Sequence, residues 1–507
     1  MKPLFRAQSE SSVRAAIVPP PAKRIPALSD LQPDPTVLAI TATILSAAAW
    51  FYGTGLDPYW ILTWVAPLPI LLAAPRLSTA TTFAAAFLSF AIGALNVWSY
   101  NRTVGLPLWL GIVAVIAPAI VFAAIALLHR LFILRGQLFR AAVTLPILWT
   151  AFEYLLEFKS PHSTWGNLGY TQINMLPLIQ IASISGIWAI SFCVFLFSGT
   201  LAALLSSTGS RKGRLAIIAA AFYIVVFGYG TWRLYTIPAA PSVRVGLISD
   251  DAARPLFPYG QQTVALAQTY AAQIPAMAAQ GAEVIILPEK IGHIQGADLD
   301  QADAIFEQVA LQNHVTIFVS FEHQPNLHQA RLYAPNGTLE ALYEKHHMLP
   351  AFEGYLLPGT ARVVVDRPSG KWGTEICKDM DFPHLSREYG QDGVGLMLVP
   401  AWDFVKDARL HAHMAILRGV ESGFSIARSA KQGMLSVSDN RGRILAWQSS
   451  APEPESSSEP FSILITSVPV LHQSTFYART GNWFAWLDLV LAAVLLLTIK
   501  LQLPAKP

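Results

Sequence analysis

The chain has 507 residues, of which 53% are hydrophobic and only 13% are charged, about half the charged fraction of an average soluble domain. This composition excludes a wholly soluble protein. The net charge of +3 and the absence of a basic run interleaved with aromatic residues argue against nucleic-acid binding. Two cysteines are too few for a disulfide framework. The length allows two or three domains.

Apolar segments at both ends of the chain predict membrane helices. Residues 1–35 are polar, proline-rich and basic, and we expect a disordered cytoplasmic tail there. Residues 36–236 then predict a membrane domain of seven spans, over 36–52, 58–75, 79–100, 107–129, 141–157, 177–208 and 214–236. An eighth span is predicted over 481–503.

The basic residues of the predicted loops indicate the orientation of these spans, because cytoplasmic loops carry an excess of lysine and arginine. With the basic tail in the cytoplasm, the cytoplasmic loops and end hold Arg76, Arg130, Arg135, Arg140, Arg211, Lys212, Arg214, Lys500 and Lys506. The short loops of the other side hold only Arg102 and Lys159. Residues 243–470 are therefore expected outside the cytoplasm.

Residues 243–470 alternate strand-like and helix-like segments. Strands are predicted over 243–248, 283–287, 315–321, 361–365, 394–399, 424–428 and 433–437, and helices over 258–279, 301–313 and 407–422. This segment is long enough for a single buried core. The pattern predicts an α/β or α-β-β-α sandwich, so the whole chain is expected to be an α+β membrane protein.

Three isolated residues of this segment suggest chemistry. Glu289 ends the apolar run 284–288, Lys345 follows a strand-like stretch, and Cys377 is the only cysteine outside the apolar regions. Acyl transfer through a thioester needs a base, a cation and a thiol. Taken singly, the two charged residues could form structural ion pairs and the thiol could be an inert buried one.

The order Glu289, Lys345, Cys377 resembles the nitrilase superfamily of carbon–nitrogen hydrolases. A domain of this type between a seventh and an eighth span resembles one branch, the apolipoprotein N-acyltransferases. The membrane part is similar to that branch in Trp165–Gln172, in Pro177–Gln180 and in Gly186–Phe192. The likeness therefore extends from about residue 140 to the end.

The resemblance implies a role for each matching residue. Glu289 would be the base, Lys345 the catalytic lysine, Cys377 the nucleophile and Glu353 a second catalytic glutamate. Trp402 would line the substrate site, although packing is the simpler interpretation of a lone tryptophan. The chain departs from the family pattern beside the nucleophile and in the expected substrate wall, at Lys378, Asp379 and Pro400.

The implied activity moves a fatty acyl chain from a membrane phospholipid to the N-terminal amine of a diacylglyceryl-cysteine lipoprotein, at the periplasmic side of a bacterial inner membrane. No cofactor is expected. No metal is expected either, because His346 and His347, or His411 and His413, point to different sides and cannot chelate together. The oligomeric state stays open. The alternatives are a membrane-anchored nitrilase-type amidase or acyltransferase with another substrate, and an inactive scaffold or transporter.

Overall fold

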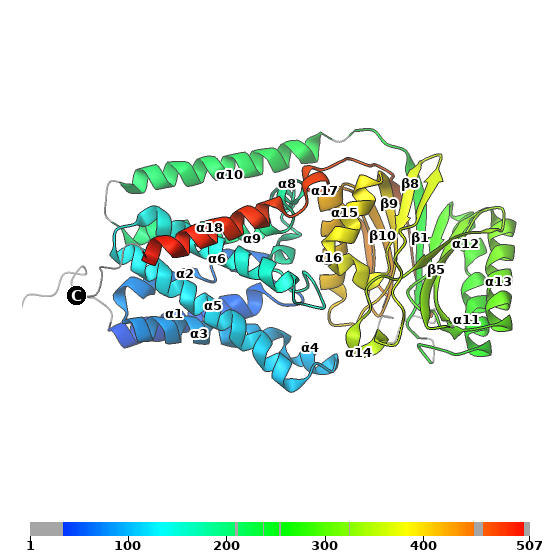
Figure 1. Cartoon of the computed structure of the whole chain (residues 1–507). Coiled ribbons are helices and arrows are strands. Elements are labelled where there is room, and N and C mark those ends of the chain that lie inside the picture. The colour runs from blue at the N-terminus through cyan, green and yellow to red at the C-terminus, as the bar shows by residue number, and fades with distance from the viewer. Residues whose placement is uncertain are drawn as a thin grey trace, which may run out of the picture.

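The computed structural model describes residues 34–207, 211–236, 238–252, 255–323, 325–450 and 460–500. Nearly all of the predicted tail over 1–35 thus lies outside the described residues. The described chain forms a helical part and a part built on two β-sheets, which lie end to end (Figure 1). We call the helical part the membrane domain and the two-sheet part the catalytic domain.

Six helical segments among the described residues are long and apolar enough to cross a membrane. They are α1 (Pro35–Gly53), α3 (Thr79–Gly93) continued through η4 (Ala94–Val97) and α4 (Trp98–Thr103), α5 (Leu108–Leu134), α6 (Leu138–Glu157), α9 (Trp188–Ser206) and α10 (Arg211–Tyr235). Many large apolar side chains on them are exposed, among them Ile44, Ile217, Ile224 and Val225. Such a surface is stable only in lipid, so the chain is a multi-pass membrane protein.

Two of the predicted spans are interrupted. The region predicted over 58–75 consists of η2 (Trp60–Trp64), α2 (Leu68–Ala73) and η3 (Ala74–Arg76), since prolines in this stretch lack the N–H donor that a continuous helix needs. The region predicted over 177–208 begins with α7 (Leu176–Ile179) and α8 (Ala182–Ser185), and α9 starts only after Gly186, whose φ is 69°. The last apolar helix is α18 (Trp483–Lys500). By helix length the described residues give six spans and three shorter apolar stretches, where the sequence predicts eight continuous helices.

The catalytic domain contains two mixed sheets. The strand order of the first is β13-β1-β2-β4-β5-β6, with β3 beside β4, and that of the second is β12-β11-β10-β9-β8-β7. The first sheet comprises β1 (Ser242–Asp250), β2 (Val284–Ile286), β3 (His293–Ile294), β4 (Thr316–His323), β5 (Leu327–Tyr333), β6 (Leu339–Glu344) and β13 (Phe461–Pro469). The second comprises β7 (Val364–Arg367), β8 (Gly370–Thr374), β9 (Val394–Trp402), β10 (Ser425–Lys431), β11 (Met434–Ser438) and β12 (Ile444–Ser449).

Helices cover the outer face of each sheet. The first sheet packs on α11 (Gln261–Ala271), α12 (Ile274–Ala279) and α13 (Ala297–Asn313), and the second on α15 (Pro383–Gln391) and α16 (Ala408–Ser422). A third apolar cluster fills the space between the sheets. The layers are therefore helix, sheet, sheet, helix, which is the predicted α-β-β-α sandwich.

The helix α16 also joins the two domains. Its side chains Ile416, Leu417 and Val420 belong to the same apolar cluster as residues of the membrane helices. In Figure 1, α15 and α16 face the membrane domain, and α8 and α17 (Phe476–Thr480) lie at the junction. The catalytic domain is thus packed against the membrane domain and is more than a tethered unit.

Candidate active site

Glu289 lies just beyond β2, an interior strand of the first sheet. The three residues of β2 are fully buried, so the first charged group appears only after the strand ends. The N–H of Glu289 donates to the carbonyl of Ala401 in β9 at 3.1 Å. Because β9 belongs to the second sheet, this turn connects the two sheets. The side chain of Glu289 is 3% exposed.

Lys345 lies far from Glu289 in the sequence, but its side chain reaches the same place. It directly follows β6, and its N–H donates to the carbonyl of His328 in β5 at 2.9 Å. Its ammonium lies 2.7 Å from Glu289 Oε1 and 2.8 Å from Glu353 Oε2. Burial opposes the ammonium charge, but the two carboxylates outweigh burial and raise the pKa of Lys345 well above its ordinary value. Lys345 is therefore a permanent cation.

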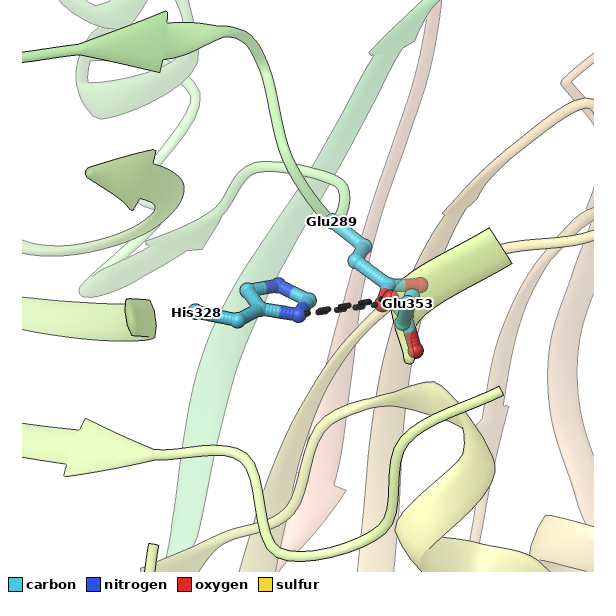
Figure 2. A group of neighbouring side chains, drawn as sticks. All are labelled: Glu289, His328 and Glu353. Carbon is cyan, nitrogen blue, oxygen red and sulfur yellow. Dashed lines mark ion pairs between the residues drawn. The ribbon is translucent and has the colours of Figure 1, made fainter. Parts of the chain in front are cut away.

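Glu353 completes this group from the one-turn helix α14 (Pro350–Glu353). Its carboxylate accepts from the N–H of Leu349 at 2.8 Å and forms an ion pair with Lys290. Burial disfavours its charge, but Lys345, His328 and Lys290 together lower the pKa of Glu353. Figure 2 shows the carboxylates of Glu353 and Glu289 close together beside the His328 ring. The result is a buried carboxylate–ammonium cluster, made of Glu289, Lys290, Lys345 and Glu353.

Cys377 occupies the start of a short 3-10 turn, η6 (Cys377–Asp381), which follows β8. Its φ is 43°, a conformation that non-glycine residues rarely adopt. The half-buried thiol lies 3.6 Å from the carbonyl oxygen of Trp402. Burial and the Glu289 charge raise the pKa of Cys377 well above its ordinary value, whereas Lys345 acts in the opposite direction. The resting thiol is therefore protonated.

The two residues after the cysteine, Lys378 and Asp379, use their side chains for hydrogen bonds with other residues. The carboxylate of Asp379 accepts from the N–H of Ile376 at 3.1 Å and from the hydroxyl of Tyr343 at 2.7 Å, and so holds the turn in place. The ammonium of Lys378 lies 3.2 Å from Asp381 and 2.9 Å from His162 of the membrane domain. Both side chains thus stabilise the turn that begins with Cys377.

Trp402 ends β9 and lies within an aromatic group. Its ring centroid is 6.2 Å from that of Phe257, which in turn contacts Tyr259 at 5.3 Å. The Lys431 ammonium lies 3.6 Å from the centre of the Trp402 ring. Nearby α14 adds a second aromatic contact between Phe352 and Phe404 at 5.4 Å. Phe352 and Tyr259 are largely exposed, with 48% and 61% of their surface accessible.

Several polar residues of the site are not suggested by the sequence. His328 is fully buried, with Nδ1 3.6 Å from Glu353 and Nε2 3.0 Å from Ser320 Oγ. Lys431 donates to the carbonyl of Lys290 at 2.7 Å, and burial lowers the pKa of Lys431 to about 7. Lys431 is the last residue of the buried strand β10, but Ser425, Arg428 and Ser429 interrupt the apolar pattern of that strand, so the sequence gives no clear signal for Lys431. His328 lies in β5 among other polar residues, so the sequence gives no signal for it either.

The donor atoms of Glu289, His328 and Glu353 lie within 4.8 Å of one another, a spacing at which a metal ion could bind. The Lys345 ammonium already lies within 3 Å of both carboxylates, and Lys290 pairs with Glu353 as well. A divalent ion would have to displace or oppose two buried cations. The donor set therefore fits ammonium groups better than a metal.

Comparisons with known proteins find similar families along both parts of the chain. Residues 46–200 match the family model for the apolipoprotein N-acyltransferase N-terminal domain, and residues 259–455 match the carbon–nitrogen hydrolase model. The apolipoprotein N-acyltransferase of Geobacter metallireducens is 26% identical, covering 90% of this chain and 94% of that protein. The one of Gloeobacter violaceus is 24% identical over 78% of each chain.

Among solved structures, an amidase from Nesterenkonia sp. has 19% identity and a TM-score of 0.40, covering 50% of this chain and 98% of that one. The first matched range lies within the membrane domain and the second within the two-sheet part. The chain is thus an enzyme of the carbon–nitrogen hydrolase (nitrilase) superfamily and belongs to its apolipoprotein N-acyltransferase family.

Proposed function

We propose that this chain transfers a fatty acyl group from a membrane phospholipid to the N-terminal amine of a diacylglyceryl-cysteine lipoprotein, through a thioester on Cys377. The observation that carries the proposal is the contact of Lys345 with both Glu289 and Glu353, all buried, beside a half-buried thiol. The name shared by the related proteins supports the acceptor. The fusion to membrane helices supports a lipid donor.

In the first half-reaction, the sulfur of Cys377 attacks the carbonyl carbon of the donor ester. The thiol proton passes to Glu289 as the S–C bond forms, because a thiol with a raised pKa needs an adjacent base. Lys345 and backbone N–H groups of the turn stabilise the negative carbonyl oxygen. The ester C–O bond then breaks, and the departing lysophospholipid oxygen takes the proton back from Glu289.

In the second half-reaction, the free amine of the lipoprotein attacks the thioester carbonyl. Glu289 accepts a proton from the attacking nitrogen, and the C–S bond breaks to leave an amide. The sulfur of Cys377 then recovers the proton, which restores the resting enzyme. Glu289 therefore acts once as base and once as acid in each half-reaction.

We propose that the aromatic group formed by Phe257, Tyr259 and Trp402, together with Phe352, receives the acyl chain. Trp402 ends β9, its ring contacts Phe257, and its carbonyl oxygen lies 3.6 Å from the sulfur of Cys377. An acyl chain against them would exclude water from the thioester. Exposed aromatic side chains next to a membrane domain are also suited to contact with lipid.

For the topology we propose eight spans in a bacterial inner membrane, with the catalytic domain in the periplasm and both ends of the chain in the cytoplasm. The apolar stretches Trp60–Arg76 and Trp483–Ile499 would be the two short spans. The C-terminal end of α10 leads into β1, and β13 leads back to α18. These two helices therefore both reach the side that carries the catalytic domain (Figure 1).

The thioester can be trapped directly. Purified full-length protein incubated with phospholipid and no amine should gain a hydroxylamine-sensitive acyl adduct on Cys377, located by mass spectrometry. Cys377→Ser should abolish the adduct, whereas Cys193→Ser, buried within α9, should retain it. A diacylated lipopeptide with a free amine should then discharge the adduct. A wild type that forms no adduct refutes the acyltransferase proposal, and an adduct that ignores the lipopeptide indicates another acceptor.

A further inference from the structure

The turn that carries Cys377 is contacted by the membrane domain as well as by its own sheet. The α6–η5 loop, residues 158–167, joins α6 to the 3-10 helix η5 (Leu168–Gln172). From this loop, His162 Nδ1 lies 2.9 Å from the ammonium of Lys378. Lys378 is the residue next to the nucleophile, so one side-chain contact links the membrane domain to the reacting position.

A second contact fixes the other end of η6. The hydroxyl of Thr164 donates to the carbonyl of Asp381 at 2.8 Å. Thr164 also lies 2.6 Å from the hydroxyl of Tyr170, which accepts from Arg418 of α16 at 2.9 Å. Because Thr164 donates to the carbonyl, it accepts from Tyr170, and the chain of donors runs in one direction. The α6–η5 loop thus holds η6 at both of its ends.

These contacts are protected from water. Lys378 is 6% exposed, and Thr164 and Asp381 are each 3% exposed. Burial, followed by the Lys378 charge, lowers the pKa of His162 to about 4. The imidazole is therefore neutral at ordinary pH, and Nδ1 can accept from the ammonium. Lys378 is also paired with Asp381 at 3.2 Å, which balances its charge.

The conformation of Cys377 needs such support. A non-glycine residue at φ 43° persists only where its surroundings hold it there. Within the turn, Asp379 holds the N–H of Ile376, just before the cysteine. The residue just after the cysteine, Lys378, is held from the membrane domain. Loss of that contact would free one side of the nucleophile.

We propose that His162 and Lys378 are positioning residues, through which the membrane domain holds the Cys377 sulfur in line with the acyl carbonyl. This inference rests on the proposed thioester chemistry and adds that the α6–η5 loop sets its rate. The proposed place for the acyl chain is the aromatic group of Phe257, Tyr259 and Trp402, which includes neither residue. His162 and Lys378 should therefore affect the chemical step and leave donor binding unchanged. A merely structural contact would change stability or binding instead.

The test uses the full-length protein in phospholipid-containing micelles and measures single-turnover adduct formation at several donor concentrations. His162→Ala and Lys378→Met should each lower the maximal rate about tenfold, since small displacements of a nucleophile are costly. The half-saturating donor concentration should not change. The double variant should be no slower than the slower single variant, because both remove one contact. His162→Asn, which keeps an acceptor, should stay within about threefold of wild type.

Arg409→Gln is the matched control. Arg409 also contacts the membrane domain, 3.4 Å from Asp57, but this pair is exposed and does not touch η6. It should react at the wild-type rate. Normal rates in His162→Ala, additive losses in the double variant, or a changed half-saturating concentration would each overturn the positioning role.

Alkylation separates failure of this inference from failure of the proposed function. Iodoacetamide reacts with Cys377 whether or not a phospholipid is a substrate. A loosened turn should expose the half-buried thiol and speed its alkylation at least about threefold in His162→Ala. If the wild type forms no acyl adduct, the proposed function fails, and the alkylation result still decides the positioning role. An unchanged alkylation rate would then overturn it.

Discussion

Replacing Glu353 by Gln removes one charge from the carboxylate–ammonium cluster without changing its shape. Both Glu353 oxygens accept from the Lys345 ammonium, at 3.0 and 2.8 Å, and they also meet Lys290 and the N–H of Leu349. A glutamine offers one oxygen, and its NH₂ group would face a donor. At least one charge-assisted hydrogen bond is lost, about 1.5–3 kcal/mol. At 1.36 kcal/mol per decade, acyl transfer should slow by roughly 10–150-fold.

The assay is the rate of adduct formation on Cys377 after rapid mixing with phospholipid. Glu388→Gln is the control, because Glu388 pairs with Arg362 on the surface, where both side chains are more than a third exposed to water. Such a pair contributes little, so this variant should react normally. Wild-type rates in Glu353→Gln, at normal expression and with a titratable thiol, would show that Glu353 serves only to hold its loop.

Three further outcomes are expected. A cysteine at the exposed position Gln261, in a background without native cysteines, should be labelled only from the periplasmic side, and cytoplasmic labelling would contradict the topology. Glu289→Gln removes a charge that raises the pKa of Cys377, so thiol alkylation should require a less alkaline pH than in wild type, while acyl transfer is lost. An unchanged dependence of the alkylation rate on pH would contradict this electrostatic reasoning. Asp407 and Asp403 outweigh burial and raise the pKa of His411 to about 9. Protonated His411 should therefore contribute at most about 3 kcal/mol to the free energy of unfolding. This contribution should be complete below about pH 6.5 and disappear as the pH rises through 9. Thermal unfolding of His411→Gln against wild type at pH 6, 8 and 10 measures this, and a pH-independent difference would contradict it.

The sequence predicts the two-sheet sandwich because its interior strands leave a clear signal. β2 and β9 are buried on both faces and read as continuous apolar runs. The strands β3, β5, β8, β12 and β13 are not predicted, and β13 pairs with β1 along its whole length, from Ser242–Pro469 to Asp250–Phe461. Partners this far apart in the chain are joined by hydrogen bonds that no local pattern records.

The residues of the candidate site likewise divide into those that the sequence suggests and those that it does not. Glu289, Lys345 and Cys377 stand out because each follows or interrupts an apolar segment, and the structure brings the two charged groups into contact. His328 lies inside β5 among other buried polar residues such as Gln329 and Arg331, so nothing in the sequence distinguishes it. The contact of Lys378 with His162 joins residues of different domains. Such contacts depend on the packing of α16 against the membrane helices, which composition alone does not specify.

The charges of Lys345, Glu289 and Cys377 suggest a separate role for each of these residues. Lys345 is held as a cation by two carboxylates, so in the proposed mechanism it would supply a fixed charge for the oxyanion at every step. Cys377 keeps its proton at rest, because burial and Glu289 both disfavour a thiolate. In the proposed mechanism, Glu289 takes a proton from Cys377 or from the attacking amine, and returns it to the departing lysophospholipid oxygen or to the sulfur. A thiol that ionises only when a carbonyl is present is protected from oxidation and unproductive alkylation while it waits for a lipid. The same arrangement makes the rate depend on where the sulfur lies, and this is the property that the contact from His162 is proposed to control.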